Sequence, residues 1–310
     1  MRAAVLHGLD DLRVEDVADP SGEVLVRVET ATACGTDVKM LRHGHRVLGS
    51  YPSRFGHETA GVRIDTGERV LVGDSVACGD CGPCRAGRAQ LCREMAWVLG
   101  GFAELIAAPE AALHAIPDRL DFAAAAMAEP LAACVHAVAR AGPDGPRAAA
   151  VLGGGTMGLM IARLLVLAGR DVTVCDRHPE RRAQAEALGA RAVEVLGRHT
   201  LIFEAVGRPD AWRAAVDAAA PGATVVLVGG CPGGTGVTLP TGPLHYDELD
   251  VRGAFHHSRA EVDDALDLLA SGAVDWRALA GETIGLDDLA AALRRPATGE
   301  ARKLVVDPSR

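Results

Sequence analysis

The segment that most restricts the fold is a glycine loop between an apolar run and an apolar helical pattern. Residues 148–155 read AAAVLGGG, and residues 156–169 read TMGLMIARLLVLAG. Gly153, Gly155 and Gly158 stand in the register G-x-G-x-x-G. After a strand and before a helix, such glycines permit a tight turn, and the helix N-terminus offers unpaired N–H groups to a pyrophosphate. The segment predicts a dinucleotide-binding βαβ unit; the alternative is a glycine-rich turn that binds nothing.

The chain after this loop keeps alternating between strand-like and helical segments. Five further segments have strand character: residues 171–176, 190–196, 200–207, 223–230 and 249–255. Helical patterns lie between them at 179–190 and 210–220. This alternation is typical of a parallel sheet built from βαβ units. We therefore expect an α/β Rossmann domain with a doubly wound parallel sheet over residues 131–255.

The remainder of the chain has a different pattern. Residues 1–130 contain short strand-like runs interrupted by Gly, Pro and Asp, which predicts a β-rich domain. Residues 256–310 contain helical patterns at 260–272 and 286–295 and a strand at 303–306, and we expect them to return to that domain. Two domains agree with a length of 310 residues.

The second strand of the predicted Rossmann domain ends at Asp176. A carboxylate there accepts hydrogen bonds from ribose hydroxyls and repels a 2′-phosphate, so NAD is favoured over NADP. Arg177 follows directly and weakens this preference. The candidate cofactor-binding residues are Gly153, Gly155, Thr156, Met157, Gly158, Asp176, Arg177, Arg181, Val206 and Gly207.

Four of the eight cysteines lie within one short segment, CGDCGPCRAGRAQLC. They are Cys78, Cys81, Cys84 and Cys92. Two C-x-x-C turns and a fourth thiolate suit a tetrahedral Zn²⁺ site that uses all its ligands and is therefore structural. Disulfides among the same cysteines are the alternative, which a cytoplasmic chain disfavours.

Charge and hydropathy exclude some classes of partner. The net charge of −9 argues against nucleic acid as the main partner. We find no apolar run of the roughly 18 residues that span a bilayer, and the N-terminus meets acidic residues too early for a secretory signal. These features predict a cytoplasmic protein with a small-molecule substrate and no membrane partner.

Three further motifs occur in a particular order: CGTD at 34–37, GHE at 56–58 and EPL at 129–131. Together with the four-cysteine segment and the glycine loop, they cover nearly the whole chain. The sequence resembles the zinc-dependent medium-chain alcohol dehydrogenases, in particular the sorbitol and threonine dehydrogenase branch. The resemblance implies that the β-rich domain is GroES-like and that the chain carries two zinc ions, one structural and one catalytic.

The resemblance also implies the ligands of the catalytic zinc. Cys34 and His57 would hold the metal, while Glu58 and Glu129 would complete or approach its coordination, and which of the two carboxylates binds directly stays open. A thiolate, an imidazole and carboxylates leave a position for water or substrate, as a catalytic zinc requires. Thr36 would begin the proton relay; the alternative is a threonine that bonds only its local backbone.

The implied reaction is hydride transfer between NAD and a secondary alcohol, such as a polyol, cyclitol or amino alcohol, and its ketone. Family members are commonly homodimers or homotetramers, and residues 249–255 are a candidate seam. One alternative is a carbonyl reductase working in the opposite direction. Another is a sensor or scaffold that binds NAD and zinc without alcohol turnover.

The sequence departs from the family pattern at Lys39, where many relatives carry a relay histidine. Basic residues surround it: Arg42, His43, His45, Arg46 and, further along, Arg54. They indicate either an anionic substrate or simply a solvated loop. Arg302 and Lys303 are candidate contacts to the pyrophosphate.

Overall fold

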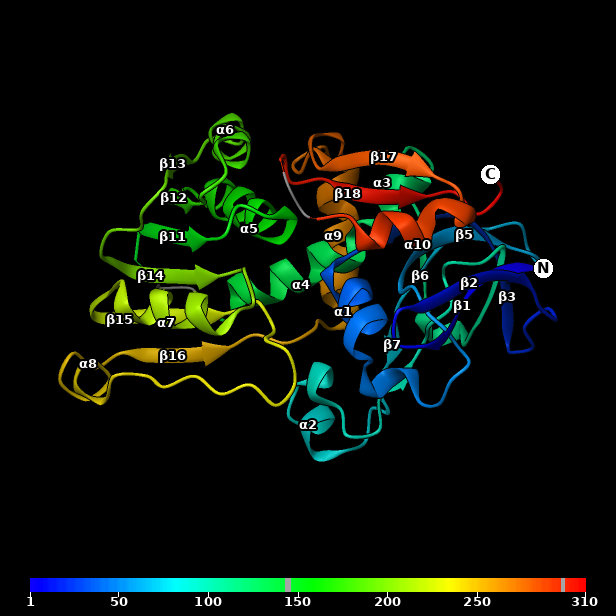
Figure 1. The fold of residues 1–310 in the computed structure, drawn as a ribbon, viewed down its shortest axis with the longest axis horizontal. Helices are drawn as coiled ribbons and strands as arrows, with labels where there is room; N and C mark the ends of the chain where they lie inside the picture. The colour runs from blue at the N-terminus through cyan, green and yellow to red at the C-terminus, as the bar shows by residue number, and fades with distance from the viewer. Residues whose placement is uncertain (143–145, 297–298) are drawn as a thin grey trace. The chain divides into compact units, whose positions relative to one another are not determined.

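The computed structural model describes residues 1–142, 146–296 and 299–310 (Figure 1). The chain forms two compact units. The first comprises Met1–Pro130, Ser258–Pro296 and Lys303–Arg310, and the second comprises Leu131–His257 and Ala297–Arg302. Helix α4 (Ala128–Ala139) carries the chain from the first unit to the second.

The second unit is built on a six-stranded sheet whose described strand pairs are all parallel, in the order β13-β12-β11-β14-β15-β16. The strands are β11 (Ala148–Leu152), β12 (Asp171–Cys175), β13 (Arg191–Val193), β14 (His199–Glu204), β15 (Ala219–Leu227) and β16 (Asp250–Gly253). The helices after α4 are α5 (Thr156–Leu167), α6 (Pro179–Ala187), α7 (Pro209–Asp217) and α8 (Thr241–Tyr246). Numbered along the chain from β11, this order is 3-2-1-4-5-6 in its Rossmann form, which confirms the predicted fold class.

The central strands of this sheet are short apolar runs because both of their faces are covered. Val151, Val174, Ile202 and Val226 are fully buried. Helix α5 packs against β11 and β12 through an apolar side that includes the fully buried Leu165. Burial of this apolar surface fixes where the glycine loop between β11 and α5 lies.

The first unit contains a seven-stranded sheet in the order β10-β6-β5-β3-β18-β17, with β9 also paired to β3. Its strands are β3 (Val24–Ala33), β5 (Glu58–Arg63), β6 (Arg69–Val72), β9 (Leu105–Ala108), β10 (Leu113–Ala115), β17 (Ala280–Ile284) and β18 (Lys303–Val306). Smaller sheets pair β1 (Arg2–Gly8) with β2 (Asp11–Asp16) and β4 (Ser53–Arg54), and β7 (Ser75–Val76) with β8 (Ala96–Trp97). The expected β-rich domain is therefore present.

The helices of the first unit are short or flank the sheet. They are α1 (Gly35–His43), α2 (Gly82–Arg85), α3 (Phe122–Ala126), α9 (Arg259–Ala270) and α10 (Leu286–Arg294). Four 3₁₀ turns join them: η1 (Arg46–Leu48), η2 (Ala89–Leu91), η3 (Glu110–Ala112) and η4 (Trp276–Ala278). Ser258 caps α9 through a capping box with Glu261, which satisfies donors at the helix start.

The segment 299–302 lies with the second unit, although we expected all of 256–310 to return to the β-rich domain. The side-chain amide of Gln184 on α6 explains this placement. Its oxygen accepts from the backbone N–H of Ala301 at 2.7 Å, and its nitrogen donates to the Ala301 carbonyl at 3.2 Å. The chain rejoins the first unit at Lys303.

One expectation about hydropathy is wrong. The stretch Phe122–Ala139 has the length and composition of a membrane-spanning helix. However, 61 % of it is buried in the structure, and it contains the buried carboxylate of Glu129. An apolar helix in a protein core has the same composition.

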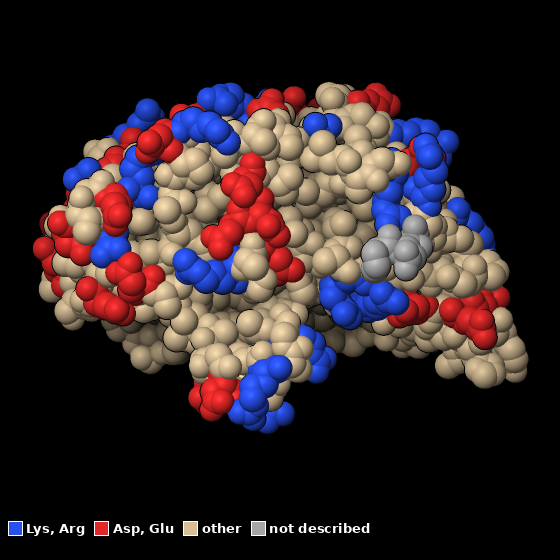
Figure 2. All heavy atoms as spheres, turned by 180° about the vertical axis from the view of Figure 1, so that it is seen from behind, with Lys and Arg blue, Asp and Glu red and all other residues tan. Residues whose placement is uncertain are grey.

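On the face drawn in Figure 2, basic and acidic side chains alternate in small groups.

Candidate functional site

Cys34 lies where β3 ends and α1 begins. It is the N-cap residue of α1, and its Sγ accepts the backbone N–H of Thr36 at 3.2 Å. The carboxylate of Asp37 accepts the backbone N–H of Cys34 in return, at 2.8 Å. A helix N-terminus favours negative charge, so this position stabilises a thiolate. Burial and the nearby Asp37 charge act in the opposite direction and raise the pKa of Cys34 in the metal-free protein.

His57 is positioned by a glycine and an aromatic pair. Gly56 has φ of 91°, and a Cβ there would lie 2.8 Å from the ring and backbone nitrogen of Phe102. Phe55 and Phe102 meet edge to face with ring centroids 5.0 Å apart, and both are fully buried. Only glycine fits this position, and the packing on either side directs the next residue, His57, into the interior.

The two nitrogens of His57 have different neighbours. Nε2 lies 3.4 Å from Sγ of Cys34, and Nδ1 lies 3.2 Å from Oδ1 of Asp37. Burial by itself would lower the pKa of His57, but the charges of Asp37 and Cys34 outweigh it and raise that pKa well above its usual value. A carboxylate on one nitrogen and a soft ligand beside the other is the arrangement that orients a metal-binding histidine.

Glu58 begins β5 and is almost fully buried. The hydroxyl of Thr32 on β3 and the ammonium group of Lys303 both donate to its carboxylate. Lys303 is itself buried. Strand β18 runs beside β3 with Leu304 opposite Ala33, so Lys303 enters the sheet next to Cys34. Burial raises the pKa of Glu58, and the Lys303 charge opposes this effect.

Glu129, in the first turn of α4, completes the cluster. It is buried, and one ligand atom from each of His57, Glu58 and Glu129 lies within 4.8 Å of the others. Cys34, Asp37 and His57 form an overlapping group under the same criterion. The structure thus brings together Cys34, His57, Glu58 and Glu129, which are far apart in the sequence.

The chemistry of this donor set fits a divalent metal. Three carboxylates and one thiolate face only one neutral imidazole and one lysine, so a cation of charge +2 would offset most of the excess negative charge. Thiolate, imidazole and carboxylate are the ligand types that zinc prefers, and the set does not require all four coordination positions to come from protein. Thr36 follows Cys34 by two residues on α1 and is half-buried.

The four-cysteine segment forms a second donor cluster. The Sγ atoms of Cys81 and Cys84 are 3.4 Å apart, those of Cys92 and Cys78 are 3.5 Å apart, and those of Cys81 and Cys92 are 3.8 Å apart. These separations are too long for disulfides. They agree with the spacing of roughly 3.8 Å that four 2.3 Å zinc–sulfur bonds impose on a tetrahedron. The residues present therefore fit a closed zinc site.

The thiols of the four-cysteine segment differ in pKa. Backbone N–H groups, first that of Arg93 and then that of Cys84, lower the pKa of Cys81 to about 6. Burial raises the pKa of Cys84 to about 12, and its neighbouring thiols add to the effect. This pattern holds for the four-cysteine segment without metal.

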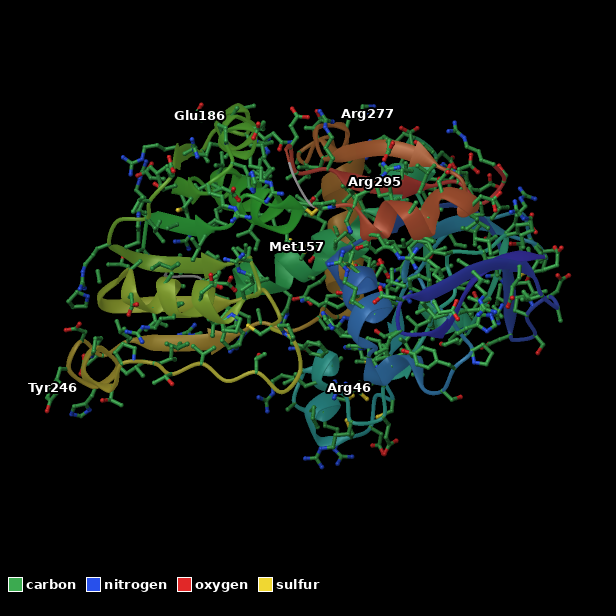
Figure 3. All side chains as sticks on the ribbon, in the orientation of Figure 1. Arg46, Met157, Glu186, Tyr246, Arg277 and Arg295 are labelled. Carbon is green, nitrogen blue, oxygen red and sulfur yellow. The ribbon has the colours of Figure 1, made fainter. Side chains whose placement is uncertain are left out.

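The glycine loop lies between β11 and α5, as predicted. Gly153 has φ of 104°, and a Cβ there would lie 2.7 Å from the Val206 side chain. A Cβ at Gly158 would lie 1.8 Å from the carbonyl oxygen of Gly153, so α5 can approach the turn only with glycine there. Gly155, the N-cap residue, faces open space. Thr156 and Met157 form the first turn of α5, where Figure 3 labels Met157.

Asp176 follows β12 and faces the same loop. Its Oδ2 accepts the backbone N–H of Gly154, and its Oδ1 accepts that of His178, each at 2.8 Å. Arg181 approaches Oδ2 at 3.7 Å and donates through Nε to the Gly299 carbonyl at 3.1 Å. The Arg177 side chain donates to the ring of His178 at 3.2 Å.

Val206 and Gly207 follow β14 and are held by a buried carboxylate. Their backbone N–H groups donate to Oε1 of Glu204 at 2.8 and 2.9 Å. Glu204 is fully buried, and burial raises its pKa. This loop therefore stands at the carboxyl end of the parallel sheet, where ligands of doubly wound sheets bind.

We call the group formed by Cys34, Asp37, His57, Glu58, Glu129 and Lys303 the metal cluster. From the sequence, no role at the metal was assigned to two of these residues, Asp37 and Lys303. Asp37 stands in the CGTD motif but was not given a role, and its spacing from Cys34 is that of a capping box, the signal that could have identified it. Arg302 and Lys303 are the two alternative candidates for a pyrophosphate contact, but the ammonium group of Lys303 pairs with Glu58. No local signal predicts that pair, because it depends on the pairing of β18 with β3.

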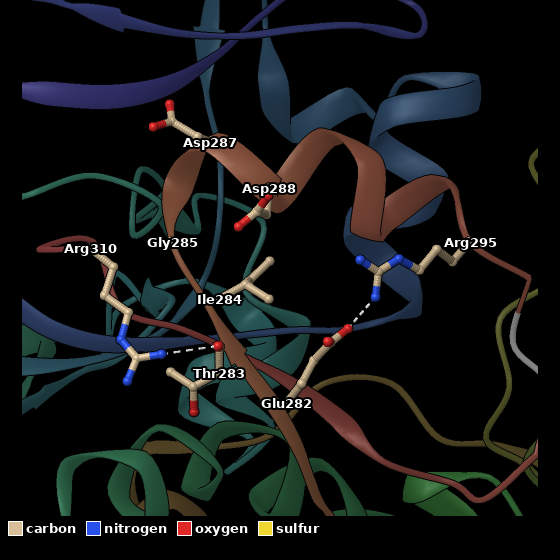
Figure 4. Close-up of a pocket in the computed structure, with 8 residues that line it drawn as sticks. All are labelled: Glu282, Thr283, Ile284, Gly285, Asp287, Asp288, Arg295 and Arg310. Atoms are coloured by element: carbon tan, nitrogen blue, oxygen red, sulfur yellow. Dashed lines mark hydrogen bonds and ion pairs between the residues drawn. The ribbon is translucent and has the colours of Figure 1, made fainter.

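A hollow of about 440 Å³ lies elsewhere in the first unit. It is lined by the end of β17, the start of α10, and Arg295 and Arg310 (Figure 4). Arg295 pairs with Glu282, and Arg310 donates to the carbonyl of Thr283. None of its lining residues belongs to either metal cluster, and it has little apolar lining.

Comparison with known families and proteins gives consistent matches. Residues 20–118 match the alcohol dehydrogenase GroES-like domain, and residues 156–271 match the zinc-binding dehydrogenase domain. The sorbitol dehydrogenase of Bacillus subtilis (strain 168) is 28 % identical and covers 100 % of this chain and 98 % of the relative. The L-threonine 3-dehydrogenase of Chelativorans sp. (strain BNC1) is 30 % identical, covering 92 % of this chain and 91 % of the relative.

A solved structure matches over a similar extent. It comes from Sinorhizobium meliloti 1021, is described as a zinc-binding dehydrogenase, and is bound to NADP. It is 30 % identical, covers 99 % of each chain and superposes with a TM-score of 0.90.

Proposed function

Because this chain belongs to the zinc-type medium-chain alcohol dehydrogenase family and is an oxidoreductase, we propose that it transfers a hydride between NAD and a secondary alcohol and its ketone. The alcohol would be a polyol, a cyclitol or an amino alcohol. The observation that carries this proposal is a pair of overlapping groups of possible metal ligands that share His57: Cys34 and Asp37 lie with it in one group, and Glu58 and Glu129 lie with it in the other.

Cys34 and His57 would hold the catalytic zinc, with Glu129 as the carboxylate that binds it directly. Glu58 is the poorer candidate because Lys303 and Thr32 already donate to its carboxylate. A zinc ion held there supplies a Lewis acid that lowers the pKa of an alcohol. Oδ1 of Asp37 lies 3.2 Å from Nδ1 of His57, although the two atoms form no hydrogen bond in the structure. We propose that this carboxylate keeps Nε2 of His57 directed at the metal position.

The proton that leaves the alcohol needs an acceptor near the metal position. The hydroxyl of Thr36 is the proposed acceptor, and the backbone N–H of the same residue donates to Sγ of Cys34 at 3.2 Å. A hydroxyl can accept one proton while donating another, so it can pass a proton toward solvent. Lys39 lies three residues further along α1 and follows Thr36 on the same side of the helix.

Cys78, Cys81, Cys84 and Cys92 would hold a second, structural zinc. Four thiolates leave no position for substrate, so this metal would stabilise the lobe rather than take part in the reaction. We therefore propose two zinc ions per chain.

NAD is the proposed cofactor, and NADP is the specific alternative. The carboxylate of Asp176 favours ribose hydroxyls over a 2′-phosphate. The NADP bound to the similar S. meliloti structure, together with Arg177 and Arg181 beside Asp176, supports the alternative. Gly155, Thr156, Met157 and Gly158 would receive the pyrophosphate at the N-terminus of α5.

We also propose that the protein is a cytoplasmic homo-oligomer. Within the described residues, which include all eight cysteines, no disulfide is formed, as expected in a reducing compartment. Strand β16 ends the strand order of the Rossmann sheet, and Phe255 just beyond it is 48 % exposed. An edge strand followed by an exposed aromatic residue is a suitable surface for self-association.

Metal analysis combined with turnover tests the proposal. The wild type should contain two zinc ions per chain and oxidise members of a polyol, cyclitol and amino-alcohol panel. Cys34→Ser should retain one zinc and lose activity, while Cys231→Ser, outside both clusters, should behave as wild type. A chain that binds NADH by fluorescence titration but oxidises no alcohol and reduces no ketone would instead be a binding protein without turnover.

A further inference from the structure

The segment between the metal-cluster residues Asp37 and His57 has an unusual charge. Residues 38–56 contain four Lys or Arg residues and two histidines but no Asp or Glu. The whole chain is acidic, with 41 Asp and Glu against 32 Lys and Arg. Positive charge is therefore concentrated in the segment that joins two residues of the metal cluster, whereas the chain as a whole is negative.

Helix α1 brings the first basic residue next to the metal cluster. Cys34 caps the helix, Thr36 lies in its first turn, and Lys39 follows at i+3 from Thr36. Residues at this spacing share one side of a helix. Lys39 is half-buried, whereas Met40 and Leu41 are buried in the core of the unit. Lys39 therefore follows Thr36 along the helix side that begins at the metal cluster.

The next residue of this segment to consider is His45, just beyond the end of α1. Gly44, with φ of 69°, ends α1, and His45 caps the 3₁₀ turn η1 by accepting the Val47 N–H at 3.5 Å. Burial lowers the pKa of His45, and the charges of Arg46, His57 and Lys39 lower it further. His45 is therefore within electrostatic reach of both the metal-cluster histidine and Lys39. Arg46, labelled in Figure 3, follows it.

Arg54 approaches from the other end of the segment. It lies on β4, three residues before His57, with its backbone paired to Val5 of β1. Its side chain passes Gly100, where a Cβ would lie 3.5 Å from Cβ and 4.0 Å from Nε of Arg54. Gly100 and Gly101 donate to the carbonyl of Gly56, so this glycine pair adjoins the residue before His57. Arg54 is half-buried in this position.

Local carboxylates do not neutralise these guanidinium groups. Elsewhere in the unit, arginines pair with nearby acids, as Arg13 does with Asp11 and Arg63 does with Asp65. Within the described parts of the chain, the side chains of Arg46 and Arg54 form no ion pair or hydrogen bond. Arg42 differs, because it donates to the carbonyl of Arg294 on α10. Arg46 is exposed, but Arg54 is half-buried. Burying a guanidinium partly from water without a partner is costly, which favours an anionic ligand as the partner of Arg54.

We propose that Lys39, His45, Arg46 and Arg54 bind an anionic group on the substrate, so that the preferred substrate is an acidic polyol bearing a carboxylate or a phosphate ester. This inference rests on the proposed dehydrogenase function and specifies its substrate class. The oxyanion would receive charge-assisted hydrogen bonds from this cluster while the reacting hydroxyl lies at the metal position. Binding energy from this remote group would then help to orient the reacting carbon.

The test uses three six-carbon compounds of related configuration: sorbitol, gluconate and sorbitol 6-phosphate. The zinc-loaded wild type should show a kcat/KM for at least one acidic compound at least about 10-fold above that for sorbitol. Lys39→Met and Arg54→Met should each reduce the ratio of kcat/KM for that acidic compound to kcat/KM for sorbitol about 10- to 100-fold. Arg42→Met is the matched control and should retain the wild-type preference for the acidic compound. Comparison of gluconate with sorbitol 6-phosphate shows whether a carboxylate or a phosphate ester is preferred.

Calorimetric titration of inorganic phosphate into the zinc-loaded, cofactor-free protein gives a readout independent of turnover. Lys39→Met and Arg54→Met should weaken phosphate binding at least about 10-fold relative to the Arg42→Met control. Equal phosphate affinity in all four proteins would overturn the inference. So would a kcat/KM for sorbitol that equals or exceeds those of both acidic compounds.

The two proposals fail in different ways. If sorbitol is oxidised as well as its acidic counterparts, the dehydrogenase function stands and acidic-substrate recognition is wrong. If no alcohol is oxidised with NAD or NADP while phosphate binding still depends on Arg54, the dehydrogenase function is wrong and the anion site remains.

Discussion

Lys303 and Glu58, which are 245 positions apart in the chain, form a buried ion pair beside the metal cluster. The two strands that carry them, β18 and β5, lie on opposite sides of β3, the strand that leads to Cys34. Lys303 thus supplies the permanent positive charge of a cluster that otherwise consists of a thiol, an imidazole and three carboxylates.

Removing Lys303 should therefore be strongly destabilising. In Lys303→Met, Glu58 is left buried without its counter-charge, and we expect a loss of about 3–5 kcal/mol in the free energy of unfolding, measured by urea denaturation. The double variant Lys303→Met/Glu58→Gln removes both charges and should recover a large part of this loss. A loss below about 1 kcal/mol in the single variant would show that the pair is not important for stability.

Asp37 should control metal affinity without being a ligand. In Asp37→Asn the partner of His57 Nδ1 loses its charge, and we expect zinc affinity at the catalytic site to fall about 10- to 100-fold. Competition with a chelator at constant pH measures the change. Asp210→Asn, at an exposed ion pair of the second unit, is the control and should leave both zinc ions in place. Unchanged affinity in Asp37→Asn would contradict the orienting role.

The metal-free protein should lose stability as pH rises. The folded-state pKa of His57 is raised well above its usual value, so the stabilisation from its proton is fully present below about pH 6.5. It is lost as pH rises through the folded-state pKa, by up to about 1.4 kcal/mol per pH unit. Urea midpoints of chelator-treated wild type and His57→Gln, measured from pH 6 to 9, test this. The variant should show a shallower decline, and parallel curves would contradict the prediction.

Cofactor preference should depend on the charge of Asp176. Asp176→Asn keeps an oxygen that can accept a backbone N–H but removes the negative charge that repels a 2′-phosphate. We expect the ratio of kcat/KM for NADP to that for NAD to rise about 10-fold or more. The control is Asp171→Asn, at the exposed start of the same strand, which should leave the ratio unchanged. A wild type that already prefers NADP would contradict the choice of NAD.

Much of the Rossmann unit could be predicted because its signals are local. The strands and helices from β11 to β16 lie close to the expected segments, since apolar runs and helical periodicity reflect burial within each element. The secondary structure of the GroES-like unit was harder to predict from the sequence. Helix α1 was not expected, because its sequence GTDVKMLRH is polar and its formation depends on the cap formed by Cys34 and Asp37.

The sequence by itself determined the kinds of ligand and the local turns that hold them. C-x-x-C spacing, the glycine register and the GHE motif act over a few residues, and their chemistry can be read without knowing the fold. Only the tertiary structure decided which distant groups meet. The pairing of β18 with β3 brings Lys303 to Glu58. Arg54 passes Gly100, whose backbone N–H donates to the carbonyl of Gly56, the residue before His57. These contacts depend on strand register and core packing, which arise from the whole chain and leave no mark at any single position.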